Sequence, residues 1–440
     1  MTTRRISIAL LMGTLWLSGC DFDIANPNSP DPIGNNPSRE RLAAAATGLL
    51  LGSRAGYAAF VLNVGIIGRE AYRFDGSEPR YTTEILTGQL DAGGFIGASN
   101  WALPYGNIRT ANELIAVVPT ASALNAAEQS AVLGFAHTMQ ALDFLQIVNT
   151  HTQDSIPLDV GIDPTAPPAP LATRTEAFVR IEALLDQGQT ELLAGGGSFP
   201  FSLTSGFTGF ETPVLFIRFN RALRARVATY RGNYAEALTH LAGSFVDTLQ
   251  SLDLGAYHTY STGAGDLTNP LSQNPQTGEN FAHPQLRDSA QLTVLGQPDR
   301  RFVAKTVTRG SQTSSGLTSD LGWVRYPNPG SFIPIIRNED LILLRAEANI
   351  QGNNLVAGLA DLNFVRVNSG GLAPLPALAS TAAGINALLY ERRYSLLYEG
   401  GHRWLDMRRY NRLNELPIDR PGDLVYPTFP VPTDEVLARQ

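Results

Sequence analysis

Cysteine and lysine are almost absent from this chain. Cys20 is the only cysteine among 440 residues, so no disulfide can form within the chain. Lys305 is the only lysine, and arginine therefore carries nearly all of the positive charge. The formal net charge of −7 argues against nucleic acid as a partner.

Motifs for metal binding, cofactor binding and covalent catalysis are also missing. The histidines are scattered without the short spacing that metal ligands need; they are His137, His151, His240, His258, His283 and His402. The sequence contains no Gly-x-Ser-x-Gly elbow, no phosphate-binding loop and no dinucleotide fingerprint. We therefore predict no catalytic residue, no metal site and no cofactor.

The N-terminus has the pattern of a bacterial lipoprotein signal. Arg4 and Arg5 precede a short apolar stretch, 6–17, which is too brief to span a membrane. Leu-Ser-Gly-Cys then ends at Cys20, the residue expected to receive lipid. Removal of residues 1–19 takes away two arginines and changes the formal charge from −7 to −9. Residues 20–37 are rich in turn formers and are expected to form a tether, followed by one domain over 38–440.

Apolar residues recur at helical spacing through most of that domain. The segments expected to be helical are 41–53, 57–67, 101–118, 125–148, 175–193, 337–351 and 355–368, together with 216–249 as a helical pair joined at Gly232. A small-residue pattern occurs twice at the same spacing, as Ala228, Gly232, Ala237 and as Ala348, Gly352, Ala357. Such a pattern is typical of tetratricopeptide-like helical hairpins. Two stretches without periodicity, about 68–100 and 254–331, are expected to be long irregular excursions.

A dense run of charge lies near the C-terminus. Its charged residues are Glu391, Arg392, Arg393, Glu399, Arg403, Asp406, Arg408 and Arg409. Helical spacing predicts one helix as far as Glu399, a stop at the following two glycines, and a second short helix. Paired carboxylates could suggest a glycosidase, but each acid here has an arginine close by that keeps it ionised. We interpret the run as a buried ion-pair network, with Arg403 pairing with Glu399 and Asp406.

This run closely resembles the C-terminal signature of the SusD/RagB family of outer-membrane nutrient-uptake lipoproteins, roughly E-R-R-x-E-L-x-x-E-G-x-R-x-x-D-L-x-R. Ser395 replaces the second Glu of the signature, and one glycine is inserted. Residues 333–348 and the spacing of Trp101, Tyr105, Ile108 and Asn112 are similar to other segments of the family. The resemblance covers nearly all of the mature chain. It implies a mainly α, SusD-like fold in which the charged run has a structural role.

Candidate ligand-binding residues lie in the two irregular stretches. Sugar-binding sites combine aromatic rings with Asn, Asp and Arg side chains, and loops on a rigid scaffold often carry them. The candidates are Tyr72, Arg73, Asp75, Arg80, Tyr81, Asn100 and Trp101 in the first stretch and Trp323, Arg325 and Tyr326 in the second. The resemblance implies that such residues converge on one shallow surface site. Trp323, among turn formers, is expected at the surface, whereas Trp101 also fits a helix-packing role.

The resemblance further implies a function without covalent chemistry. A SusD-like protein is lipid-anchored at the outer membrane, faces outward, binds a nutrient oligomer such as a glycan, and passes it to a SusC-like TonB-dependent transporter. Two alternatives stay open, a lipid-anchored glycosidase and a tetratricopeptide scaffold that binds periplasmic proteins. The residues do not choose between a glycan, a peptide and another oligomer.

Overall fold

The computed structural model describes residues 33–440 except 88–89, 154 and 164–165. The expected signal peptide, the lipid-bearing Cys20 and the tether as far as residue 32 lie outside the described residues. Ile33–Gln440 forms one compact unit. Helices dominate this unit, which confirms the mainly α prediction.

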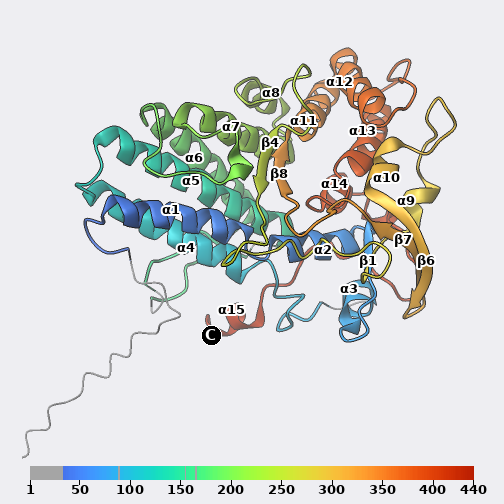
Figure 1. Cartoon of the computed structure of the whole chain (residues 1–440), viewed down its shortest axis with the longest axis horizontal. Coiled ribbons are helices and arrows are strands. Elements are labelled where there is room, and N and C mark those ends of the chain that lie inside the picture. Colours follow the sequence, from blue (N-terminus) through green and yellow to red (C-terminus); the bar gives the residue numbers. More distant parts are fainter. Residues whose placement is uncertain (1–32, 88–89, 154, 164–165) are drawn as a thin grey trace, which may run out of the picture. The chain divides into compact units, whose positions relative to one another are not determined.

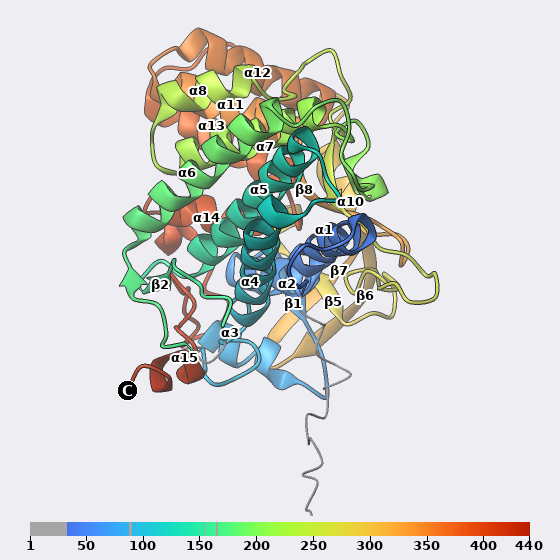
Figure 2. The same cartoon turned by 90° about the vertical axis from the view of Figure 1, so that its left-hand side faces the viewer.

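The helices pack mainly as hairpins of consecutive elements. The longer ones are α1 (Arg39–Arg54), α2 (Tyr57–Ile67), α4 (Ala102–Val117), α5 (Ala126–Thr150), α6 (Arg174–Leu193), α7 (Pro213–Tyr230), α8 (Tyr234–Ala242), α11 (Asn338–Gln351), α12 (Leu355–Asn368), α13 (Thr381–Ser395) and α14 (His402–Arg409). Helix α5 packs on α6, α7 on α8 and α11 on α12, while the α6–α7 and α8–α11 contacts stack one hairpin on the next (Figure 1). Helices α1, α4 and α5 lie side by side (Figure 2). This stacking is the tetratricopeptide-like arrangement expected from the sequence.

Local sequence explains where these helices begin and how closely they approach. Asn125 and Glu128 form a reciprocal capping box at the start of α5, which satisfies backbone N–H groups there. In the repeated pattern, Ala228, Ala237 and Ala348 pack together in one small cluster between α7, α8 and α11. Gly232 adopts φ +79°, a left-handed conformation that allows the tight turn from α7 to α8.

Two predicted helix ends are wrong. Helix α8 ends at Ala242, so the expected helix to residue 249 is too long. Helix α13 ends at Ser395 and does not reach Glu399. The chain leaves helical geometry at Leu396, and Tyr398 then adopts φ +61°, which no continuing right-handed helix allows.

The two stretches expected to be irregular contain strands that pair with one another. The four-stranded sheet has the order β1 (Ala71–Arg73), β5 (Asn280–Ala282), β7 (Leu317–Trp323) and β6 (Thr306–Ser314). Strand β1 comes from the first stretch and pairs antiparallel with β5 from the second. A second small sheet joins β4 (Gly255–His258) to β8 (Ile333–Arg337), and a third joins β2 (Ile156–Pro157) to β3 (Leu171–Ala172). Strands β1, β2, β3 and β5 have two or three residues each and are too short for period-two patterning to reveal them. The longer strands β6 and β7 were missed because their stretch is rich in Gly, Ser and Thr and shows no clear apolar alternation.

Short elements complete the unit. They are η1 (Pro79–Tyr81), α3 (Glu84–Thr87), η2 (Val118–Thr120), η3 (Ser205–Phe207), α9 (Gln285–Asp288), α10 (Arg300–Lys305), η4 (Leu413–Glu415) and α15 (Thr433–Leu437). Two helical stretches, Arg39–Ile67 and Ala126–Thr150, are long and apolar enough to cross a membrane. Most of each is buried inside the fold, as in the core helices of a globular protein.

Candidate functional site

Four of the predicted ligand residues lie together at the surface. Arg73, Asp75, Arg80 and Tyr81 are all at least partly exposed. The Tyr81 ring meets the ring of Phe95 edge-on, with 5.8 Å between centroids. Arg73 lies over Tyr81 at 4.7 Å and Arg80 lies over Phe95 at 4.5 Å. We call Arg73, Arg80, Tyr81 and Phe95 the aromatic–arginine cluster.

The β1–β5 pairing holds this cluster in place. Arg73 lies at the end of β1, opposite Asn280, and forms ion pairs with Asp75 at 3.0 Å and Glu279 at 2.9 Å. Glu279 comes from the second stretch, so segments about two hundred residues apart meet here. A hydrogen bond from Arg73 lowers the pKa of the Asp75 carboxyl. The cluster therefore combines exposed rings with charged hydrogen-bonding groups fixed on a sheet edge.

Phe95 was not among the predicted residues, although its side chain is 48 % exposed. It lies in a glycine-rich part of the first stretch, where few neighbouring side chains can cover a ring, so the sequence could have indicated its exposure. Exposure of a large aromatic side chain beside arginines is typical of a binding surface.

The other candidates from the first stretch are buried. Tyr72 stacks on Phe74 and its hydroxyl lies 3.0 Å from Nε2 of His283. Trp101 packs against Tyr105 and His151 at the start of α4, which agrees with a helix-packing role. Asn100 is buried beside it with φ +64°, and its side chain donates to Ser99.

The second group of candidates belongs to the core, so the expectation of a surface position for Trp323 is wrong. Trp323 is 5 % exposed and stacks on Tyr398 with 4.2 Å between ring centroids. The buried Tyr326 hydroxyl donates to the Tyr398 carbonyl at 2.8 Å. Arg325 pairs with the buried Glu399. The left-handed turn at Tyr398 is the reason, because it directs that ring against β7 and gives Trp323 a partner that the surrounding sequence lacks.

The charged C-terminal run forms the buried ion-pair network that we expected, with partners from distant elements. Glu391 pairs with Arg301 at 2.6 Å and Arg366 at 2.8 Å. Arg392 pairs with Glu347 at 2.5 Å and Asp406 at 3.1 Å. Arg393 donates to Gln285, and Arg409 joins Asp406 and Glu347. Each of these carboxylates faces more than one cation, which is how buried charges are retained.

The predicted pairing of Arg403 with Glu399 and Asp406 is wrong. Within the described part of the chain, Glu399 is paired instead with Lys305, Arg325 and Arg337. Arg403 lies just beyond the glycine break, near the start of α14, and is partly exposed. Burial and the neighbouring Arg393 lower the pKa of Arg403 to about 10. Closeness in sequence misled the prediction, since both carboxylates are taken by other cations: Glu399 by Lys305, Arg325 and Arg337, and Asp406 by Arg392 and Arg409.

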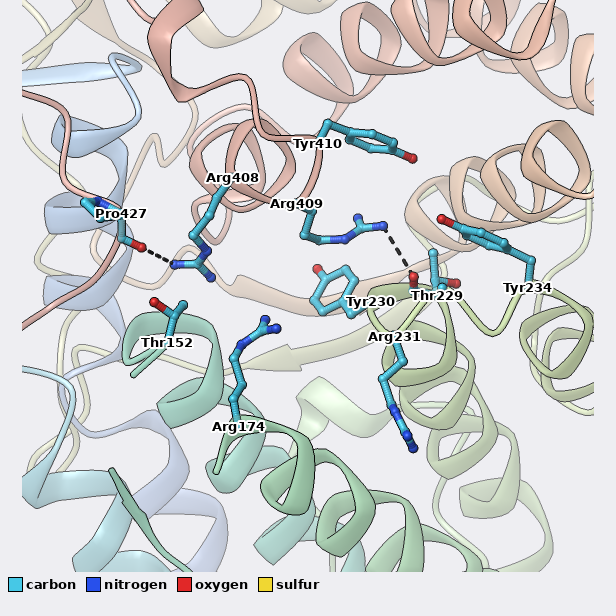
Figure 3. A pocket seen from close by; sticks show the side chains of 11 residues that line it. Thr152, Arg174, Thr229, Tyr230, Arg231, Tyr234, Arg408, Arg409, Tyr410 and Pro427 are labelled. Carbon is cyan, nitrogen blue, oxygen red and sulfur yellow. Dashed lines mark hydrogen bonds between the residues drawn. The ribbon is translucent and has the colours of Figure 1, made fainter. Parts of the chain in front are cut away.

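A pocket of about 520 Å³ was missed from the sequence. It lies where the ends of α7 and α14 meet the starts of α6 and α8 (Figure 3). Its walls carry Arg174, Arg231, Arg408 and Arg409 together with Tyr230, Tyr234 and Tyr410. We call this the basic pocket. The adjacent arginines at the end of the charged run were the only available signal, because the other lining residues come from distant helices.

The fold is that of the SusD-like proteins. The sequence matches no protein-family model and none of the curated proteins. A SusD superfamily protein from Bacteroides vulgatus is similar, with a TM-score of 0.68 at 14 % identity over 92 % of this chain and 98 % of that one. A laminarin binding SusD-like protein has a TM-score of 0.65 at 17 % identity, over 91 % and 98 %. A SusD-like carbohydrate binding protein from Bacteroides fragilis has a TM-score of 0.69 at 14 % identity, over 86 % and 87 %. The resemblance read from the charged run is thus confirmed at the level of the fold.

Proposed function

We propose that this protein binds an oligosaccharide at the aromatic–arginine cluster and passes it to a SusC-like, TonB-dependent transporter of the outer membrane. The observation that carries the proposal is the pair of rings formed by the partly exposed Tyr81 and the exposed Phe95, with an arginine over each. Aromatic faces pack against the apolar faces of sugar rings, and charged groups beside them bind hydroxyls.

The solved neighbours support a glycan as the ligand class. One is described as laminarin binding and another as carbohydrate binding, and both share the fold over most of their length. We infer the lipid on Cys20 from the lipobox, the Leu-Ser-Gly-Cys motif that ends at this residue. The family resemblance suggests the outward-facing position at the outer membrane and the transporter. In this proposal the protein concentrates the oligomer at the cell surface and delivers it intact.

The charge state of the cluster favours binding over hydrolysis. A general acid needs a raised pKa. Here Arg73 lowers the pKa of Asp75, and Arg80 lowers the pKa of Glu78. Both carboxyl groups are therefore ionised at neutral pH and suited to accepting hydrogen bonds from sugar hydroxyls.

Affinity electrophoresis in gels that contain single polysaccharides, laminarin among them, tests the proposal. At least one glycan should retard the protein in the gel, and the glycan chains should keep their length. Replacing both rings, Tyr81→Ala with Phe95→Ala, should weaken binding by about 1–3 kcal/mol, the usual effect of losing anchor aromatics. Phe332→Ala is the matched control, since Phe332 is also an exposed phenylalanine, 38 % exposed, in another part of the unit. Equal retardation of the double variant and the wild type would place the site elsewhere.

A further inference from the structure

The basic pocket has an excess of positive charge on its walls. Its lining includes four arginines and no aspartate or glutamate among the described residues. Two of the arginines are neutralised from behind, since Arg231 pairs with Glu182 and Arg409 pairs with Glu347 and Asp406. This concentration of charge is unusual in a chain with a formal net charge of −7.

Backbone carbonyls hold Arg408, and no carboxylate among the described residues does so. Its guanidinium donates to two backbone carbonyls, those of Asn149 at 2.6 Å and Pro427 at 3.1 Å. Among the described residues, the charged groups that act on its pKa are the arginines Arg174 and Arg409, and no carboxylate is among them. A guanidinium has five N–H donors, so the two carbonyls leave donors for a further acceptor.

Nearby arginines destabilise the positive charge of Arg408, and a bound anion would offset this effect. Figure 3 shows Arg174 and Arg408 pointing toward one another across the pocket, whereas Arg231 points away from them. Burial, and then the charge of Arg174, lower the pKa of Arg408 to about 9. Burial and the charge of Arg409 lower the pKa of Arg174. An anion beside Arg408 would offset the positive charge that Arg174 and Arg409 place on it.

A purely structural role accounts for part of this arrangement. The carbonyl of Asn149 lies in the last turn of α5, and Arg409 donates to the carbonyl of Thr229 in the last turn of α7. Arginines commonly compensate the negative C-terminal ends of helices in this way. That role does not require an open pocket of about 520 Å³, which falls in the size range of small-ligand sites.

The rings in the wall indicate which kind of anion fits. Tyr230, Tyr234 and Tyr410 all line the pocket and are partly exposed. The Tyr410 hydroxyl is held by Glu347 at 2.6 Å, and Arg409 lies over the Tyr230 ring at 4.6 Å. Flat aromatic walls beside guanidinium donors suit a sugar ring that bears a carboxylate, which arginine binds in a bidentate manner.

We propose that the basic pocket is a second ligand site, which binds the carboxylate of an acidic sugar unit through Arg408, with Arg174 and the tyrosine rings completing the site. The inference rests on the proposed function, because it specifies the class of glycan that this protein would accept. It places acidic sugar recognition in the helical hairpins and leaves neutral sugar recognition at the aromatic–arginine cluster.

Calorimetry with trigalacturonate and with its methyl ester tests this inference, since the two trimers differ in charge and not in their sugar rings. The acid should bind at least tenfold more tightly than the ester. Added salt should weaken binding of the acid and leave binding of the ester unchanged. Arg408→Gln should reduce the affinity for the acid to that for the ester. Arg408→Lys should recover only part of the loss, because an ammonium group lacks the bidentate geometry.

Further variants and probes show whether the ligand is a sugar acid and whether it binds in the basic pocket. Tyr234→Ala should weaken binding of trigalacturonate, and it tests the site even if the Arg408 variants fold poorly. Arg39→Gln, a surface change on α1, is the control and should leave the affinity for trigalacturonate unchanged. Equal binding of acid and ester would overturn the inference. Binding of triglutamate or inorganic sulfate as tight as that of trigalacturonate would overturn the assignment to a sugar. A protein that is retarded by neutral glycans and shows no acid preference would keep the proposed function and lose this second site.

Discussion

The only lysine of the chain, Lys305, donates a hydrogen bond from Nζ to Oε1 of the buried Glu399 at 2.9 Å. Arg325 and Arg337 pair with the same carboxylate at 3.1 Å and 2.9 Å. Burial lowers the pKa of Lys305 to about 8, while the surrounding cations hold the pKa of Glu399 well below its usual value. Just beyond the end of α13, Glu399 is thus the carboxylate that Lys305 and Arg325 pair with, while Arg337 pairs with both Glu399 and Glu339.

Glu399→Gln should lower the free energy of unfolding by roughly 3–5 kcal/mol, because it leaves buried cations without their counter-charge. Lys305→Met should cost much less, since Glu399 keeps both arginines and an apolar chain of similar length fills the space. Denaturant unfolding of the two variants and the wild type measures the difference. Equal losses of unfolding free energy for both variants would show that Glu399 is not the main counter-charge of Lys305, Arg325 and Arg337.

Glu70 should make stability depend on pH in the opposite sense from a paired carboxylate. It is 1 % exposed, and burial raises its pKa from 4.5 to about 8 in the folded protein. The folded state then holds a proton that the unfolded state releases near pH 4.5, so this contribution to stability is complete below pH 4.5 and is lost as pH rises through about 8.

Urea unfolding between pH 4 and about 9 tests this for the wild type and Glu70→Gln. The glutamine cannot ionise, so the variant should gain stability relative to the wild type as pH rises across that window. Titration of all other groups is common to both proteins and cancels in the difference. Parallel curves would mean that Glu70 titrates at an ordinary pKa.

Most helices could be predicted because each one carries its own signal. Residues 57–67 and 355–368 were expected from apolar spacing alone and match α2 and α12 at both ends. Asn125 marked the start of α5 through a local capping pattern. Such features depend on residues within one or two turns, which a single sequence displays directly.

Several of the parts that escaped prediction depend on partners far along the chain. Strand β1 is three residues long and exists because β5, about two hundred residues later, pairs with it. Trp323 was expected at the surface since its neighbours in sequence cannot cover it, yet Tyr398 does so. The basic pocket joins Arg174 to Arg408 across the hairpins, and no local pattern records that approach.

Arg392→Met should be strongly destabilising, by roughly 3–5 kcal/mol, because Arg392 lies between two buried carboxylates, Glu347 and Asp406. Arg403→Ala is the matched control in the same charged run. This change leaves Glu399 and Asp406 with their own cation partners, so it should lower the free energy of unfolding clearly less than Arg392→Met. Thermal melts of both variants provide the comparison, and a larger loss for the Arg403 variant would restore the pairing that the sequence suggested.

Cys20→Ser should abolish lipid attachment and move the protein from the membrane fraction to the soluble fraction. The reason is the lipobox that ends at the only cysteine of the chain. Metabolic labelling with a radioactive fatty acid, followed by fractionation, measures both effects. Ser29→Ala, outside the lipobox, should behave as the wild type, and a Cys20→Ser protein that still carries the label would refute the predicted anchor.

Trp323→Ala should lower the free energy of unfolding by roughly 3–5 kcal/mol, the usual cost of truncating a buried tryptophan. The ring is 5 % exposed and lies nearly parallel to Tyr398, with an interplanar angle of 7°. Trp323→Phe keeps an aromatic face against Tyr398 and should recover part of the loss. Phe332→Ala, at an exposed ring, should leave the melt unchanged. Glycan affinity measured well below the melting temperature should be the same for Trp323→Phe as for the wild type, because the buried ring at the end of β7 is covered by Tyr398 and is out of reach of a ligand. A stable Trp323→Ala protein with weakened glycan binding would instead return this ring to the ligand site.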